Sequence, residues 1–115
     1  MSLESDLLKI EDKFWTGGPE AYRQHVDQQC LVAFPEMAGV VPGEDIAKSA
    51  ENGRWQDVSL NARGIVNMSD TAVVITYECH AKRKDGKPHH ALVSSGYVKR
   101  PSGWKLAFHQ QTPLQ

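Results

Sequence analysis

The side chains best suited to chemistry are histidines and cysteines, and they are scattered along the chain rather than grouped in motifs. A metal centre needs about three converging ligands, whereas the neighbours His89 and His90 point to opposite faces of any strand that carries them. No Cys-x-x-Cys occurs, and two cysteines, Cys30 and Cys79, do not make a disulfide framework. The sequence therefore predicts buried free thiols, and we expect neither a metal nor a cofactor.

The second half of the chain supplies the strands that must position these residues. From Trp55 onward, apolar and polar residues alternate with a period of two, which is typical of strands with one buried face. Gly64 suggests a bulge in the first of these strands. Asp85-Gly86 has the residue types of a type I′ turn, so residues 71–83 and 90–99 are expected to form a hairpin. Residues 104–112 are expected to form the last strand.

The first half of the chain predicts helices. Apolar residues recur there at helical spacing, and glycine or proline separates the segments. The expected elements are helices over 5–16 and 19–26, a short strand over 31–34, and a third helix from Glu44 to an Asn52-Gly53 stop. Helices followed by long strands predict a single α+β domain over residues 1–115, with a strongly curved sheet wrapped around the helices. The hollow between sheet and helices would be a pocket.

Five stretches together resemble the NTF2-like superfamily, whose fold is a cone-shaped α+β domain. They are the Gly17-Gly18-Pro19 break, Val32–Pro35, Val41–Ile46, Ser94–Arg100 and Gly103–Pro113. Within the superfamily, the chain most resembles the small proteins of the SnoaL-like and DUF4440-like groups, and the last two stretches look specific to the DUF4440-like group. The resemblance implies three N-terminal helices packed on a strongly curved, mainly antiparallel sheet, and a homodimer formed through the outer faces of the sheets. It implies no single activity, because members include enzymes and non-catalytic association domains.

The ketosteroid isomerases of this superfamily allow a comparison residue by residue. Their general-base aspartate, oxyanion tyrosine and protonated second aspartate fall on Phe34, Ile10 and Ser95 of this sequence. Proton abstraction next to a carbonyl needs a base and a donor to the developing oxyanion, and phenylalanine and isoleucine supply neither. Steroid isomerisation by that route is therefore not expected.

The same resemblance implies which residues face the pocket, and most of them are aromatic. The expected ligand-binding residues are Trp15, Tyr22, Phe34, Met37, Trp55, Tyr77, Ser95, Tyr97, Phe108 and Gln110. Aromatic walls with a few hydroxyl and amide groups are typical of small-molecule sites. The alternative is that these side chains simply fill the core, because apolar alternation is also the ordinary signal of a core.

The orientation of His109 separates two hypotheses. Alternation along the last strand places His109 on the outer face with His80, at a dimer contact or in solvent. A slip of one residue in the register exchanges the two faces and would place His109 in the pocket as a general base. On the outer face, Glu78 and Arg63 either form an ion pair or remain two solvated charges.

Size and charge exclude several classes of function. The 115 residues make one domain, the net charge of −1 gives no basic field for nucleic acid, and no apolar run approaches the roughly 18 residues of a membrane helix. We expect a cytoplasmic homodimer that binds a small, largely apolar ligand. The alternatives are a cyclase, isomerase or dehydratase that uses Tyr77, Tyr97 or His109, and a non-catalytic dimerisation module.

Overall fold

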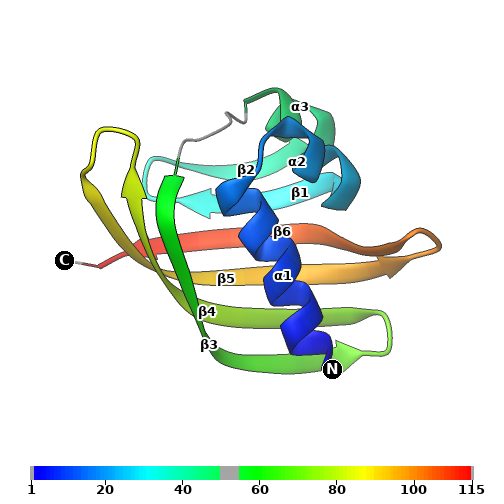
Figure 1. Ribbon diagram of the computed structural model, residues 1–115. Helices are drawn as coiled ribbons and strands as arrows, with labels where there is room; N and C mark the ends of the chain where they lie inside the picture. The colour runs from blue at the N-terminus through cyan, green and yellow to red at the C-terminus, as the bar shows by residue number, and fades with distance from the viewer. Residues whose placement is uncertain (1, 50–54, 115) are drawn as a thin grey trace.

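The computed structural model describes residues 2–49 and 55–114, which form three helices packed against one curved six-stranded sheet (Figure 1). This confirms the expected α+β class. The helices are α1 (Leu3–Thr16), α2 (Pro19–His25) and α3 (Gly43–Ser49). The strands are β1 (Val26–Phe34), β2 (Met37–Pro42), β3 (Trp55–Ser69), β4 (Ala72–Arg83), β5 (Pro88–Arg100) and β6 (Gly103–Pro113). None of the described helices is long and apolar enough to cross a membrane.

The sheet brings the first and last strands of the chain side by side. Its order is β2-β1-β6-β5-β4-β3, with β1 and β6 parallel and every other pair antiparallel. The expected hairpin joins β4 to β5, but its turn is not of type I′, because Gly86 has a positive φ of 87° and Asp85 does not. The Gly86 N–H donates to the Arg83 carbonyl at 2.8 Å, as in a three-residue loop that ends on a left-handed glycine. In Figure 1, α1 crosses one face of the sheet, and α2 and α3 lie together near β1 and β2.

The helix α1 supplies the apolar stripe that covers the inner face of the sheet. The Ser2 hydroxyl accepts a hydrogen bond from the Ser5 N–H at 3.1 Å and so caps the start of the helix. The helix ends at Gly17, whose N–H donates to the Lys13 carbonyl at 2.8 Å. A Cβ at Gly17 would lie 2.7 Å from that carbonyl oxygen, so a larger residue would disturb this end. The buried residues of α1 are Leu7, Glu11, Phe14 and Trp15.

A bulge in β6 reverses the expected orientation of the second half of that strand. Tyr97 pairs with Leu106 but Gly96 pairs with Phe108, which leaves Ala107 as an extra residue in β6. An inserted residue moves everything beyond it to the opposite face. Ser95 therefore pairs with His109, and the two share the inner face that α1 covers.

The first half of the chain differs from the sequence expectation in two places. The strand β1 begins at Val26, well before the expected start, and its partner β2 was not expected at all. As an edge strand, β2 has Gly39 inside it and Pro42 at its end, and both residue types weaken the sequence signal of a strand. The expected stop of α3 at Asn52-Gly53 lies outside the described residues.

Cys30 and Cys79 are free and fully buried, as the sequence predicts. Burial, with a smaller contribution from the nearby Glu11 carboxylate, raises the pKa of each thiol to about 12. The thiolate is the nucleophilic form of cysteine, so at neutral pH neither residue is a candidate nucleophile.

Candidate functional site

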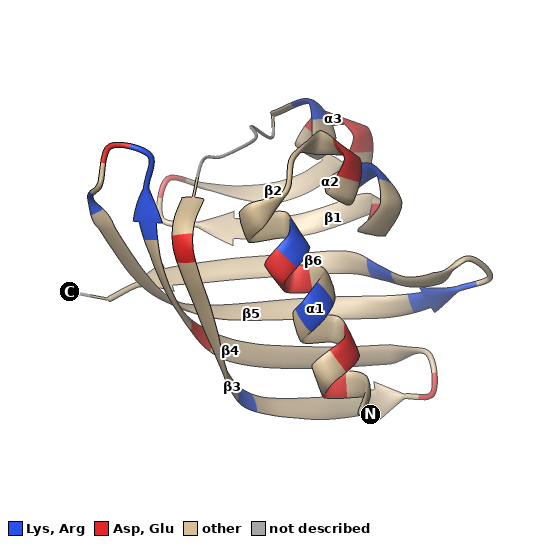
Figure 2. Ribbon diagram, in the orientation of Figure 1, with Lys and Arg blue, Asp and Glu red and all other residues tan. Residues whose placement is uncertain are grey.

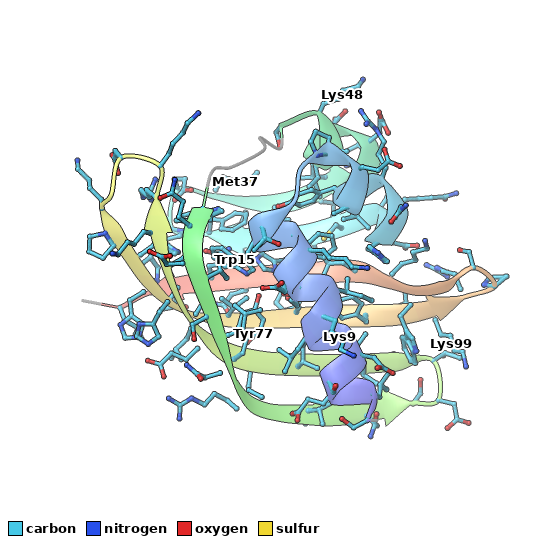
Figure 3. All side chains as sticks on the ribbon, in the orientation of Figure 1. Lys9, Trp15, Met37, Lys48, Tyr77 and Lys99 are labelled. Carbon is cyan, nitrogen blue, oxygen red and sulfur yellow. The ribbon has the colours of Figure 1, made fainter. Side chains whose placement is uncertain are left out.

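The centre of the protein contains a buried carboxylate, that of Glu11 on α1, with no exposed surface. The Tyr77 hydroxyl donates to Glu11 Oε1 at 2.6 Å, and the Ser95 hydroxyl donates to the same oxygen at 2.8 Å. The Tyr97 hydroxyl donates to Oε2. Trp15 Nε1 in turn donates to the Tyr77 oxygen at 3.0 Å, and Figure 3 labels these two side chains on the same side of α1. Glu11 thus accepts three hydroxyl donors, which is the bonding pattern of an ionised carboxylate.

The two tyrosines serve as donors to Glu11 and not as bases. Burial, followed by the Glu11 charge, raises the pKa of Tyr77 and of Tyr97 well above the usual range. Both hydroxyls therefore keep their protons at any physiological pH. Both rings are fully buried around Glu11 rather than on the surface of a cavity. Their geometry fits a structural support for the carboxylate.

His109 connects this buried carboxylate to open space. Its Nδ1 lies 2.9 Å from Ser95 Oγ and 3.9 Å from Glu11 Oε1. Because the single Ser95 proton goes to Glu11, Ser95 Oγ accepts from His109 Nδ1–H, and the network assigns the neutral Nδ1–H tautomer. His109 Nε2 then carries a lone pair, and the Gln111 amide donates to it at 3.0 Å. Burial lowers the pKa of His109, and the Glu11 charge partly opposes this shift.

A cavity of about 560 Å³ lies over His109, between the sheet and the helices. Five of the expected ligand-binding residues line it, namely Trp15, Tyr22, Phe34, Met37 and Trp55. The Trp15 and Trp55 rings meet edge to face with centroids 5.1 Å apart, and His89 lies 4.7 Å from the Trp55 ring. The Phe34 ring lies 5.8 Å from the imidazole of His109. The wall is therefore largely apolar and contains five aromatic rings, and its polar groups include the histidines and Gln111 as well as three charged residues, namely His109, Gln111, His89, Glu36, Asp45 and Arg83.

The other five expected residues do not line this cavity. Tyr77, Ser95 and Tyr97 lie behind it, around Glu11. The expected inward orientation of Phe108 and Gln110 is wrong, because the β6 bulge moves both to the outer face and places His109 and Gln111 inside. Of the two orientations considered for His109, the structure has the inward one.

Glu11 is the functional residue that sequence reasoning missed. It lies four residues after Leu7 and three and four residues before Phe14 and Trp15, on the apolar stripe of α1. An acidic residue at an apolar position of a helix is unusual, because buried charge is costly unless it is hydrogen-bonded. That mismatch was the available signal. His89 was also missed as a cavity residue. Adjacent residues of a strand face opposite sides, and without the strand register the sequence did not show which of His89 and His90 faces the cavity.

The outer face of the sheet bears a second polar cluster. Of the two alternatives for Arg63 and Glu78, the structure has the ion pair. His80 and His90 contact the other oxygen of the same carboxylate. The hydrogen bonds from His90 and, second, from Arg63 lower the pKa of Glu78 to about 2. Glu78 therefore remains ionised across the physiological pH range.

Comparisons with known proteins found likeness in structure alone. No protein-family model matches the chain, and no curated protein does. An NTF2-like protein of unknown function from Prochlorococcus marinus matches at a TM-score of 0.77 and 17% identity, covering 100% of this chain and 95% of that one. A ketosteroid isomerase-like protein from Erwinia carotovora atroseptica matches at 0.74 and 14% identity, covering 98% and 94%.

A hub homology domain of CaMKII from Chlamydomonas reinhardtii matches at a TM-score of 0.73 and 18% identity, covering 100% of both chains. The names of these neighbours describe different functions. Because their identity to this chain is low, the likeness shows the fold and not the function. The narrower resemblance to the SnoaL-like and DUF4440-like groups stays a prediction. The element order, the curved sheet and these neighbours together identify the fold of this chain as NTF2-like.

Proposed function

We propose that the cavity binds a small, largely apolar molecule and that His109 exchanges a proton with it. The observation that carries this proposal is the position of His109. The residue lines the cavity, and its Nδ1 contacts the Ser95–Glu11 pair. The cavity volume lies within the usual range of small-molecule sites, roughly 300–1,000 Å³. Aromatic rings in the wall favour a planar or cyclic ligand, and Gln111 and His89, which contact each other at 3.3 Å, could turn to bind one polar group of it.

The chemistry expected of His109 is general acid–base catalysis. In the assigned tautomer, Nε2 holds a lone pair that can accept a proton from a bound substrate when Gln111 moves aside. The resulting imidazolium would be stabilised by the Glu11 charge, 3.9 Å from Nδ1 and bridged by Ser95. Burial keeps His109 neutral in the resting state by lowering its pKa, which suits a base at neutral pH. Returning the proton to another atom would make the reaction an isomerisation, cyclisation or dehydration.

This route does not use the positions of the ketosteroid isomerase base. Phe34, on which that base falls, is apolar, and its ring lies tilted 5.8 Å from the His109 ring, so it contributes a wall rather than a proton acceptor. Ile10 is likewise unable to donate to an oxyanion. The proposal therefore assigns the acid–base role to a different strand, β6, of the same fold.

The proposal is tested with nitrobenzisoxazole, an apolar aromatic probe that opens when a base removes its ring proton. The base takes the C–H proton, the N–O bond breaks, and a coloured cyanophenolate forms. We expect the protein to exceed the same concentration of free imidazole, and His109→Gln to lose about 10²- to 10⁴-fold. His25→Gln, which changes a histidine of α2 outside the cavity lining, should retain most of the rate. A wild-type rate equal to that of imidazole, or an unaffected His109→Gln, would refute the catalytic role.

Binding is measured separately, so that a non-catalytic pocket is recognised. Trp15 and Trp55 are in the wall, so their fluorescence should change when the probe enters. Trp55→Ala should weaken binding because it removes a stacking surface, whereas His109→Gln should leave binding nearly unchanged. If the probe binds with these mutational effects but is not turned over, the protein is a binding domain and not an enzyme of this class.

A second candidate function, self-association through the outer face, is supported by an apolar row that crosses all six strands of the described sheet. Neighbouring residues in the register are Val66, Val74, Gly96, Phe108, Leu31 and Val40, in that order. Val66 and Val40, at its two ends, are 63% and 61% exposed. Figure 2 shows the middles of β1, β2, β5 and β6 without acidic or basic residues. Extended exposed apolar surface is typical of protein interfaces.

The occupant proposed for this face is a second copy of the chain. Light scattering at micromolar concentration should then give a dimer. Leu31→Asp, in the middle of the row, should give a monomer, and Ser102→Asp, in the exposed β5–β6 turn, should not. A wild-type monomer, or a Leu31→Asp variant that remains dimeric, would rule out this interface.

A further inference from the structure

We propose that Glu78, His80 and His90 form a binding site for a divalent transition-metal ion, Zn²⁺ in particular, on the outer face of the sheet. Each residue offers one ligand atom, and these atoms all lie within 4.8 Å of one another. The site is separate from the cavity, because residues 78 and 80 of β4 face away from the buried Tyr77 and Cys79. It therefore requires nothing from the proposed acid–base function.

The sheet itself sets the spacing of the three residues. Glu78 and His80 are two apart in β4 and so share a face. His90 lies directly opposite His80 in β5, and their rings stack with centroids 4.0 Å apart and an angle of 19° between the planes. Two hydrogen-bonded strands thus hold all three side chains, without a loop. Sequence reasoning placed His80 on the outer face with His109, but it had no strand register and so did not place His90 opposite His80.

The donor atoms suit zinc. Two imidazoles and one carboxylate form a three-ligand set that, with water in the fourth position, occurs at open zinc sites. His80 Nε2 lies 3.4 Å from Glu78 Oε2, and His90 Nε2 contacts the same oxygen. Ligand atoms around a tetrahedral zinc are about 3.3 Å apart, so small side-chain rotations suffice. The ion would replace any proton on the two Nε2 atoms, so binding releases protons.

Exposure leaves room for the ion and for a water ligand. The side chains of His80 and His90 are 51% and 33% exposed, whereas the carboxylate of Glu78 is mostly covered and held in place by Arg63. Arg63 uses Oε1 and leaves Oε2, the oxygen that faces both imidazoles. The positive guanidinium of Arg63 also repels a cation at this site. Replacing Arg63 with a neutral residue therefore tests how the zinc affinity depends on charge.

The test is calorimetric titration of tag-free protein with ZnCl₂. We expect one ion per chain, and a loss of at least tenfold in affinity for His80→Gln and for His90→Gln. Arg63→Gln should increase the affinity about three- to tenfold, because one positive charge is removed near a divalent ion. His25→Gln, which changes a histidine on α2, should have no effect. Circular dichroism confirms that each variant is folded.

A second measurement on the wild type does not depend on any variant. Heteronuclear NMR of the imidazole nitrogens should show zinc-induced shifts at Nε2 of His80 and His90, and none at His89 or His109. The proposal is overturned if zinc does not bind at concentrations up to about 1 mM, if the two glutamine variants bind as the wild type does, or if the shifts appear at the cavity histidines instead.

Discussion

Replacing Glu11 with glutamine tests the most unusual feature of the core. The three hydrogen bonds from Tyr77, Ser95 and Tyr97 now end on a charged acceptor. Hydrogen bonds to charged groups contribute about 1.5–3 kcal/mol each, and neutral ones about 0.5–1.5. The difference is about 1–1.5 kcal/mol per bond, so changing three of them predicts a loss of about 3–4.5 kcal/mol in the free energy of unfolding. That is a large fraction of the usual 5–15 kcal/mol for a domain.

The loss is measured by urea denaturation followed by tryptophan fluorescence, in which Trp15 reports directly because it donates to Tyr77. The midpoint should fall with little change in the slope, and the melting temperature should fall by about 12–18 °C. Asp12→Asn, the next residue along α1, is exposed and should change stability by less than about 0.5 kcal/mol. A Glu11→Gln variant as stable as Asp12→Asn would refute the assignment of Glu11 as a charged acceptor of three buried hydroxyls.

Acid should destabilise the protein, because burial lowers the pKa of His25, His89 and His109 in the folded state. The unfolded chain then binds more protons below pH 6.5, so the free energy of unfolding should fall as the pH drops from about 6.5 through the lowered folded-state values; a flat profile from pH 7.5 to 5.5 would contradict this. Cys30 and Cys79, with a pKa of about 12, should not react with iodoacetamide in the native protein at pH 8 and should react after denaturation. Rapid alkylation of the native protein would show that the thiols are not sealed in the core.

The strands of the second half could be predicted because β4 and β5 each have one buried face and β3 alternates between partly buried and exposed residues over its first half. Alternation and the Asp85-Gly86 turn depend on local chemistry, which a single sequence displays. The edge strand β2 could not be predicted, because Gly39 and Pro42 interrupt its pattern and its pairing with β1 is not local. The resemblance to the NTF2-like superfamily supplied the order of layers, which periodicity alone does not give.

The candidate site was predicted less completely than the fold. The aromatic wall followed from residue types, but the orientation of His109 depends on the extra residue Ala107 in β6. No residue type within β6 marks that bulge. The partner strand has Gly96 beside it, where a Cβ would lie only 3.1 Å from Phe108 Cβ. Glu11 was visible as an acid on an apolar stripe, but its three partners come from distant strands.

The central claim is that His109 faces the cavity in contact with the Glu11 network, and NMR titration of His109 tests it most directly. Because burial lowers the pKa of His109 and Glu11 opposes that shift, the wild-type value should lie below 6.5. The Glu11→Gln variant should lower it further, because the stabilising charge is removed from the imidazolium. A wild-type value at or above 6.5 that is unchanged in Glu11→Gln would contradict the account.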